Sequence, residues 1–87
     1  MDTMAQQISE LESVVASLNE IQEDVTVPRN VRTQMQSIMT TLRTETELSI
    51  KINKALSQLA EIANDINIQS YTRTQIWNLI SVLEKLH

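Results

Sequence analysis

Apolar residues recur along the chain at intervals of three and four positions, in four separate stretches. These intervals place side chains on one face of an α-helix. Polar residues interrupt the pattern near residues 24–28, 43–47 and 64–70, so the sequence predicts four helices. The apolar positions are Met4, Ile8, Leu11, Val15 and Leu18, widened by Val14 and Ile21; Val31, Met35, Ile38 and Leu42; Leu48, Ile52, Ala55, Leu56, Leu59 and Ile62; and Ile76, Leu79, Ile80, Leu83 and Leu86.

Three residues indicate where the later helices begin. Pro28 is the only proline, and proline is favoured in the first turn of a helix, so the second helix is expected to start there. Thr44 is followed three residues later by Glu47, the spacing of a capping box, which predicts the start of the third helix. Ser70 is expected to cap the fourth helix.

The second half of the chain repeats the first. A shift of 41 residues brings eight of the 25 residues in 18–42 onto identical residues in 59–83. A period near forty is the length of a helix pair. We therefore predict an all-α, four-helix up-and-down bundle, built from two αα-hairpins at about residues 3–43 and 44–87 within a single domain 1–87. The identical pairs are Leu18/Leu59, Glu20/Glu61, Ile21/Ile62, Asp24/Asp65, Arg32/Arg73, Thr33/Thr74, Gln34/Gln75 and Leu42/Leu83.

The composition excludes several kinds of chemistry. Glycine is absent, which argues against a β protein and excludes a glycine-rich phosphate loop. Cysteine is absent, so no disulfide, thiolate nucleophile or cysteine-ligated metal is possible. The single histidine, His87, provides neither the Glu-x-x-His pairs of a bundle di-metal site nor an activating base for a serine. We expect no enzyme activity and no cofactor.

Charge and hydropathy limit the kinds of partner that the protein can be expected to have. The formal net charge is −4, and the seven Lys and Arg residues are scattered, which disfavours nucleic acid. Arg43, Lys51 and Lys54 do gather near the second predicted connection, but Glu45 and Glu47 lie among them, which is typical of a solvated surface. No apolar run is long enough for a signal peptide or a membrane span. The sequence therefore predicts a cytoplasmic protein without a membrane partner.

The repeated connections carry the first candidate site. In an up-and-down bundle the first and third connections lie at the same end, which would collect Glu20, Asp24, Glu61 and Asp65 there. Four carboxylates could hold Mg²⁺ or Ca²⁺. The alternative is structural, and we favour it because Arg32 and Arg73 supply countercharge. In that hypothesis each aspartate caps the next helix or pairs with the arginine eight residues on. The structural turn residues are Asp24, Pro28, Arg32, Asp65 and Arg73.

The last predicted helix carries the second candidate site. Trp77 lies to one side of its apolar stripe, with Arg73 one turn earlier, where the guanidinium could cover the indole ring. Tyr71 and Val82 lie on the other flank, and Ile50 and Ile68 also fall off the core stripes. This apolar excess predicts an interface with a protein partner or a second copy. The alternative is a tryptophan that only shields a helix–helix seam.

Two resemblances accompany these motifs. Asp24, Pro28, Val31 and Arg32 resemble the turn of a HEAT repeat, in which an Asp and an Arg brace successive helix pairs; the second half has Gln69 and Thr72 in place of the proline and the valine. More specifically, "VPRNVR" at residues 27–32 and "TRTQIW" at residues 72–77 resemble a family of small archaeal proteins known only as uncharacterised. The resemblance implies a four-helix bundle from an archaeon and no activity.

These observations favour a small structural or protein–protein interaction module whose contact surface is on the last helix. A metal-binding protein that uses the four carboxylates is the alternative. A weakly nucleic-acid-associated protein is the third hypothesis.

Overall fold

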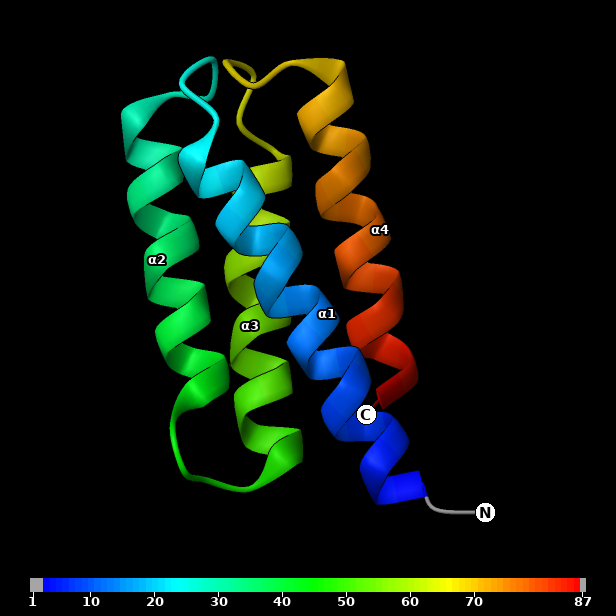
Figure 1. The fold of residues 1–87 in the computed structure, drawn as a ribbon. Coiled ribbons are helices and arrows are strands. Elements are labelled where there is room, and N and C mark those ends of the chain that lie inside the picture. The colour runs from blue at the N-terminus through cyan, green and yellow to red at the C-terminus, as the bar shows by residue number, and fades with distance from the viewer. Residues whose placement is uncertain (1–2, 87) are drawn as a thin grey trace.

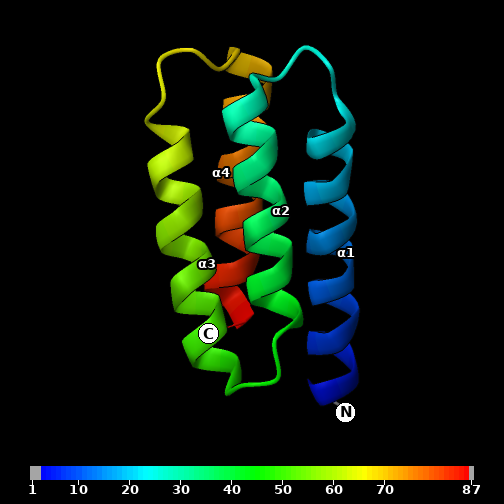
Figure 2. The ribbon, with the colours of Figure 1, turned by 90° about the vertical axis from the view of Figure 1, so that its left-hand side faces the viewer.

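The computed structural model of the protein describes residues 3–86, with side chains for residues 5–86. Its four helices are α1 (Thr3–Glu23), α2 (Arg29–Arg43), α3 (Leu48–Ala63) and α4 (Ser70–Leu86). Consecutive helices run in opposite directions, and the connections 24–28 and 65–69 lie side by side at one end of the bundle (Figures 1 and 2). The predicted all-α, four-helix up-and-down bundle is confirmed.

The helices stand at the corners of a square. α1 and α3 each pack against α2 and α4, while their own backbones do not approach one another, as is expected of a diagonal pair. Packing is most extensive between α1 and α2, the first predicted hairpin, and is thinnest between α1 and α4. The result is an elongated molecule of 41 × 21 × 20 Å. The uneven packing of α1 leaves one of its faces partly uncovered, and this face is described below.

The core is aliphatic, as the composition requires, and it reproduces the sequence repeat. Equivalent residues of the two halves are buried to nearly the same degree; Leu18 and Leu59, for example, are both completely inaccessible to solvent. Burying such a side chain stabilises the fold by about 1.5–3 kcal/mol. The fold therefore consists of two similar hairpins that share one core. Other equivalent buried pairs are Ile21/Ile62, Val27/Ile68, Met35/Ile76 and Leu42/Leu83.

The helix starts follow the sequence at α2 and depart from it at α3. Pro28 occupies the N-cap position of α2 with φ −54° and ψ 144°, one residue before the helix. The capping box predicted from Thr44 and Glu47 is wrong. The Thr44 hydroxyl donates to the Thr40 carbonyl at 2.8 Å, so Thr44 ends α2, and Glu47 is itself the residue before α3, without a side-chain cap. Ser70, the predicted cap of α4, is the first residue of that helix.

Two other expectations about packing are corrected. Ile8, Leu11 and Val15 were placed on the core stripe of the first helix; Leu11 and Val15 are half-buried and pack against the core, but Ile8 is exposed. Ile68 was placed off the core and is buried, because the turn after Asp65 folds its side chain back over the bundle end. Met4 and His87 lie outside the residues whose side chains are described.

Candidate functional site: the paired joints and the start of α4

The connections 24–28 and 65–69, called here the first and second joints, have the same backbone hydrogen bonds. In each joint the amide of the aspartate bonds a carbonyl at the end of the preceding helix. The carbonyl of the same aspartate accepts from the amide three residues later. The arginine eight residues after the aspartate then donates its amide to the carbonyl four residues before it, in the first turn of the next helix. The bonds are Asp24 N to Ile21 O (3.2 Å), Val27 N to Asp24 O (3.1 Å) and Arg32 N to Pro28 O (3.0 Å), against Asp65 N to Ile62 O (2.9 Å), Ile68 N to Asp65 O (3.5 Å) and Arg73 N to Gln69 O (3.0 Å).

Each joint is tightened by its aspartate side chain. Asp24 Oδ1 accepts from the Thr26 amide at 2.9 Å and from the Thr26 hydroxyl at 2.6 Å. Asp65 Oδ1 accepts from the Asn67 amide at 2.8 Å. A carboxylate that bonds the amide two residues on forms an Asx-turn, which fixes the loop backbone. The pKa of Asp24 lies below its ordinary value. The hydrogen bond from the Thr26 hydroxyl is the largest cause, and the bond from the Thr26 amide and the charge of Arg32 act in the same direction, whereas partial burial opposes them.

The two arginines of the repeat differ. Arg73 Nε donates to the Ala63 carbonyl at 3.0 Å and its Nη2 donates to the Asp65 carbonyl at 2.8 Å, so Arg73 ties the end of α3 to the second joint. Nε of Arg32 is buried and has no acceptor. Relative to the repeat, α1 continues one residue further than α3. Bracing by arginine is therefore achieved in the second joint, through carbonyls and not through the aspartate carboxylate.

The four carboxylates do not form a cluster. Within residues 5–86 no group of three or more His, Asp or Glu side chains is arranged to hold a metal ion. Asp24 and Asp65 are turned towards their own loops, and Glu20 and Glu61 are exposed on their helices. The repeat brings both joints to one end of the bundle, as expected, but Glu20, Asp24, Glu61 and Asp65 are not gathered there into a metal-holding group among the described residues.

Each joint presents one aliphatic side chain to solvent. The residue that follows each aspartate, Val25 or Ile66, is 83% or 90% exposed. Two positions later, Val27 and Ile68 are buried. Because both joints lie side by side at the same end of the bundle, the two exposed side chains belong to one end of the molecule (Figures 1 and 2). Sequence reasoning missed this pair, although the alternation in "DVTV" and "DINI" indicates that only one aliphatic residue of each joint can face inwards.

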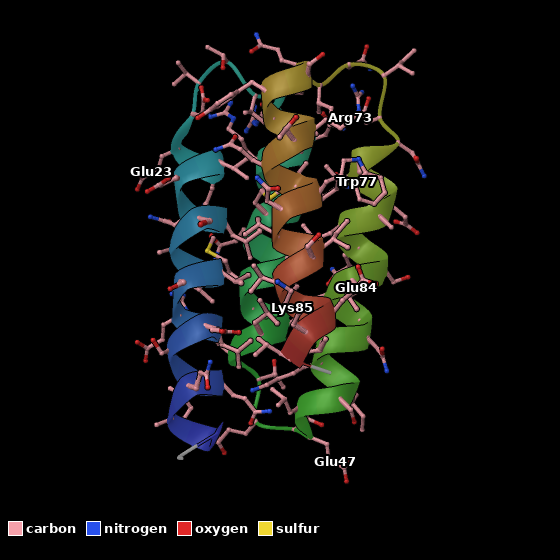
Figure 3. The ribbon with its side chains drawn as sticks, turned by 90° about the vertical axis from the view of Figure 1, so that its right-hand side faces the viewer. Glu23, Glu47, Arg73, Trp77, Glu84 and Lys85 are labelled. Carbon is pink, nitrogen blue, oxygen red and sulfur yellow. The ribbon has the colours of Figure 1, made fainter. Side chains whose placement is uncertain are left out.

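The interface residues predicted on α4 fall into two groups. Tyr71 is exposed in the first turn, and Trp77 is about half exposed and points towards α3 beside Arg73 (Figure 3). Val82 is half-buried against the core, and Arg73 is engaged with carbonyls of the second joint. Only Tyr71 and Trp77 are therefore free to contact another molecule.

Fold and site together define a small helical-hairpin repeat protein with a tightly hydrogen-bonded end. The chain belongs to the uncharacterised protein family UPF0147, whose family model matches residues 1–86. The predicted membership of an uncharacterised archaeal family is confirmed. Within residues 3–86 none of the helices combines the length and hydropathy needed to cross a membrane.

Relatives of similar length support this assignment. The chain is 43% identical to a UPF0147 protein of Archaeoglobus fulgidus over 76 residues, which is 87% of each chain. It resembles the crystal structure of a UPF0147 protein from Thermoplasma acidophilum with a TM-score of 0.88 and 36% identity, covering 93% of this chain and 96% of the other. It also resembles the crystal structure of the unknown-function protein MMP1188, with a TM-score of 0.82 and 39% identity over 86% of each chain.

Proposed function

We propose that the protein is a non-enzymatic protein–protein interaction module that binds its partner through the joint end of the bundle and the adjoining start of α4. We call this the apex surface and define it as Val25, Ile66, Tyr71 and Trp77. The observation that carries the proposal is the exposure of Val25 and Ile66 at equivalent positions of the two joints.

The exposure of these two side chains is imposed by the fold. Val25 lies between Asp24 and Thr26, which are hydrogen-bonded to each other, and Ile66 lies between Asp65 and Asn67, which are bonded in the same way. On the inner side, Val27 and Ile68 anchor the joints in the core. Neither Val25 nor Ile66 can therefore turn inwards without breaking its joint. Isolated exposed aliphatic residues are common, whereas these two are held outwards at the same end of the bundle, where one partner could contact both.

Tyr71 and Trp77 extend the apex surface along α4. Both belong to the residue types that dominate binding energy at interfaces, and their rings leave few torsions to be ordered on binding. Trp77 occupies the position that Gln36 has in the first half, and Tyr71 that of Asn30. The two aromatic residues of the apex surface thus lie on the second hairpin only. The surface differs between the two hairpins, which supports a partner that contacts them differently.

A heterologous partner fits this surface better than a second copy does. An end-on dimer could bury little more than the 21 × 20 Å cross-section of the bundle on each partner. Stable specific interfaces bury roughly 800 Å² per partner. A partner that covers the joints and continues along α4 to Trp77 would reach that area.

Quantitative affinity capture from an extract of the native organism tests the proposal. The bait is the full chain, and the variants are Ile66→Ser and, as a matched control, Ile50→Ser, which removes an exposed isoleucine at the opposite end. Both variants should melt at the wild-type temperature, because exposed substitutions change stability by within about 0.5 kcal/mol. The proposal expects captured proteins that are lost with Ile66→Ser and retained with Ile50→Ser. Capture that is the same for both variants would overturn it.

A further inference from the structure

The N-terminal half of α1 has an apolar face that the rest of the bundle covers only in part. Val14, Leu18 and Ile21 are buried in the core, but Leu11 and Val15 are half-buried and Ile8 is 52% exposed. The cause is the direction of α1, which leans away from α2 and from the α2–α3 connection towards its N-terminal end (Figure 1). The uncovered residues are spaced three and four apart, the spacing by which one helix packs against another.

A groove of about 720 Å³ follows this face. Its α1 wall runs from Ile8 to Asn19, a length of about 16 Å at the rise of an α-helix. Leu11 and Val15 line its floor together with Leu42 of α2. We call this the α1 groove. None of the apex-surface residues lines it, so it is separate from the apex surface.

The two rims of the α1 groove carry opposite charges. Glu12 lies on the α1 side, and Arg43 and Lys51 lie on the side formed by α2 and α3. Among the side chains that the structure describes, residues 5–86, no ion pair joins these two rims. α1 itself contains four glutamates and no Lys or Arg, so it is an acidic helix beside a basic rim that it does not reach.

These features match one occupant, the α1 helix of a second copy. In a dimer with two-fold symmetry the same surface patch meets itself, so the patch must be self-complementary. The α1 groove satisfies this requirement: an apolar stripe lies between an acidic rim and a basic rim. Placing two copies face to face brings the Glu12 of each opposite the Arg43 and Lys51 of the other. An unrelated anionic ligand would find only the basic rim complementary.

We propose that the chain forms a two-fold dimer through the α1 groove, with Ile8, Leu11 and Val15 of both copies packed together and Glu12 of each copy facing Arg43 and Lys51 of the other. The dimer leaves the apex surface of each copy uncovered. It would present two copies of that surface, which converts a single binding module into a bivalent one. The dimer does not depend on the proposed function of the apex surface.

Charge reversal on the two rims tests the dimer. Sedimentation equilibrium is measured over protein concentrations up to about 1 mM, a range that detects weak association. We compare an acid-rim variant, Glu12→Arg, with a basic-rim variant, Arg43→Glu/Lys51→Glu. Each variant alone places like charges opposite one another at both symmetry-related contacts and should weaken the dimer by at least about tenfold. An equimolar mixture of the two variants places opposite charges at both contacts, so the mixed dimer should form.

Matched controls separate the groove from general charge and stability. Glu20→Arg and Arg29→Glu/Lys85→Glu make the same changes in net charge outside the groove and should dimerise like the wild type. Ile8→Ser should dissociate the dimer, whereas Ile50→Ser, at a residue that is 55% exposed outside the groove, should not. A wild type that stays monomeric to the highest concentration, or mixed rim variants no heavier than either alone, would overturn the proposal. Ile66→Ser should dimerise normally, so failure of the apex proposal would leave this one unaffected.

Discussion

Arg73 donates from Nη2 to the main-chain carbonyl of Asp65 at 2.8 Å, while its counterpart in the first joint, Arg32, has a buried Nε without an acceptor. Two residues that the sequence repeat makes equivalent thus differ in what they contribute. A buried donor without an acceptor costs free energy, whereas a charged donor bonded to carbonyls stabilises.

The first prediction concerns these two arginines. Arg73→Met should lower the free energy of unfolding by about 2–3 kcal/mol, because it removes two charge-assisted hydrogen bonds. It takes away the side-chain donor of the Ala63 carbonyl and leaves the Asp65 carbonyl with only the long bond from the Ile68 amide. Arg32→Met should change the free energy of unfolding by less than about 1 kcal/mol, since it also removes the unpaired Nε. Urea denaturation of both variants measures the difference. Equal losses would contradict this account of the joints.

The second prediction concerns the shared core. Leu18→Ala and Leu59→Ala should each cost about 2–5 kcal/mol, because both side chains are fully buried and leave a cavity. Their equivalent places in the repeat predict similar losses. Ile8→Ala, on the uncovered part of α1, should cost much less. Chemical denaturation gives the three values, and a large loss for Ile8→Ala in the monomer would mean that α1 packs more closely than described.

The third prediction concerns pH. The pKa of Asp24 is lowered by its bonds to Thr26, so the folded state holds the charged form more strongly than the unfolded state does. Its contribution to stability is therefore present above the unfolded-state pKa of about 4 and is lost as the pH falls through the lower folded pKa. The amide shift of Thr26, followed by NMR, should titrate with a midpoint below that ordinary value. Thr26→Val removes the hydroxyl donor and should raise the midpoint of the amide at position 26; an unchanged midpoint would assign the shift to another cause.

The fourth prediction separates the two proposed surfaces. Trp77 lies on α4 and faces α3, away from the α1 groove (Figure 3). Its emission maximum and its quenching by acrylamide should be those of a half-exposed tryptophan, and they should not change as the protein concentration is raised through the dimer equilibrium. Protection of Trp77 that follows protein concentration would instead place self-association on α4.

The sequence predicted the fold well because the two strongest signals agreed. Apolar spacing located four helices, and the 41-residue repeat paired them into hairpins. The prediction from sequence failed where one side chain could hydrogen-bond either of two different groups. Thr44 was expected to cap α3, but its hydroxyl bonds the carbonyl of Thr40 and ends α2. Local side-chain bonding of this kind competes with capping, and the sequence does not reveal which bond forms.

The site was harder to predict, because it depends on the direction of individual side chains. Asp24 and Asp65 were correctly placed at equivalent joints, but their Asx-turns, which keep them apart from any shared site, follow from backbone geometry. Ile68 was placed off the core stripes, whereas it is buried, and the exposed residue of the second joint is Ile66. The lean of α1, which opens the α1 groove, results from packing that spacing alone cannot predict.

The central claim is that the two joints form a single contact surface for one partner. Photo-crosslinking in cells of the native organism tests it most directly, with a benzophenone amino acid placed in turn at positions 25, 66 and 50. The account predicts that positions 25 and 66, on different joints, give the same crosslinked partner and that position 50 does not. Different partners at positions 25 and 66, or the same partner at all three positions, would contradict it.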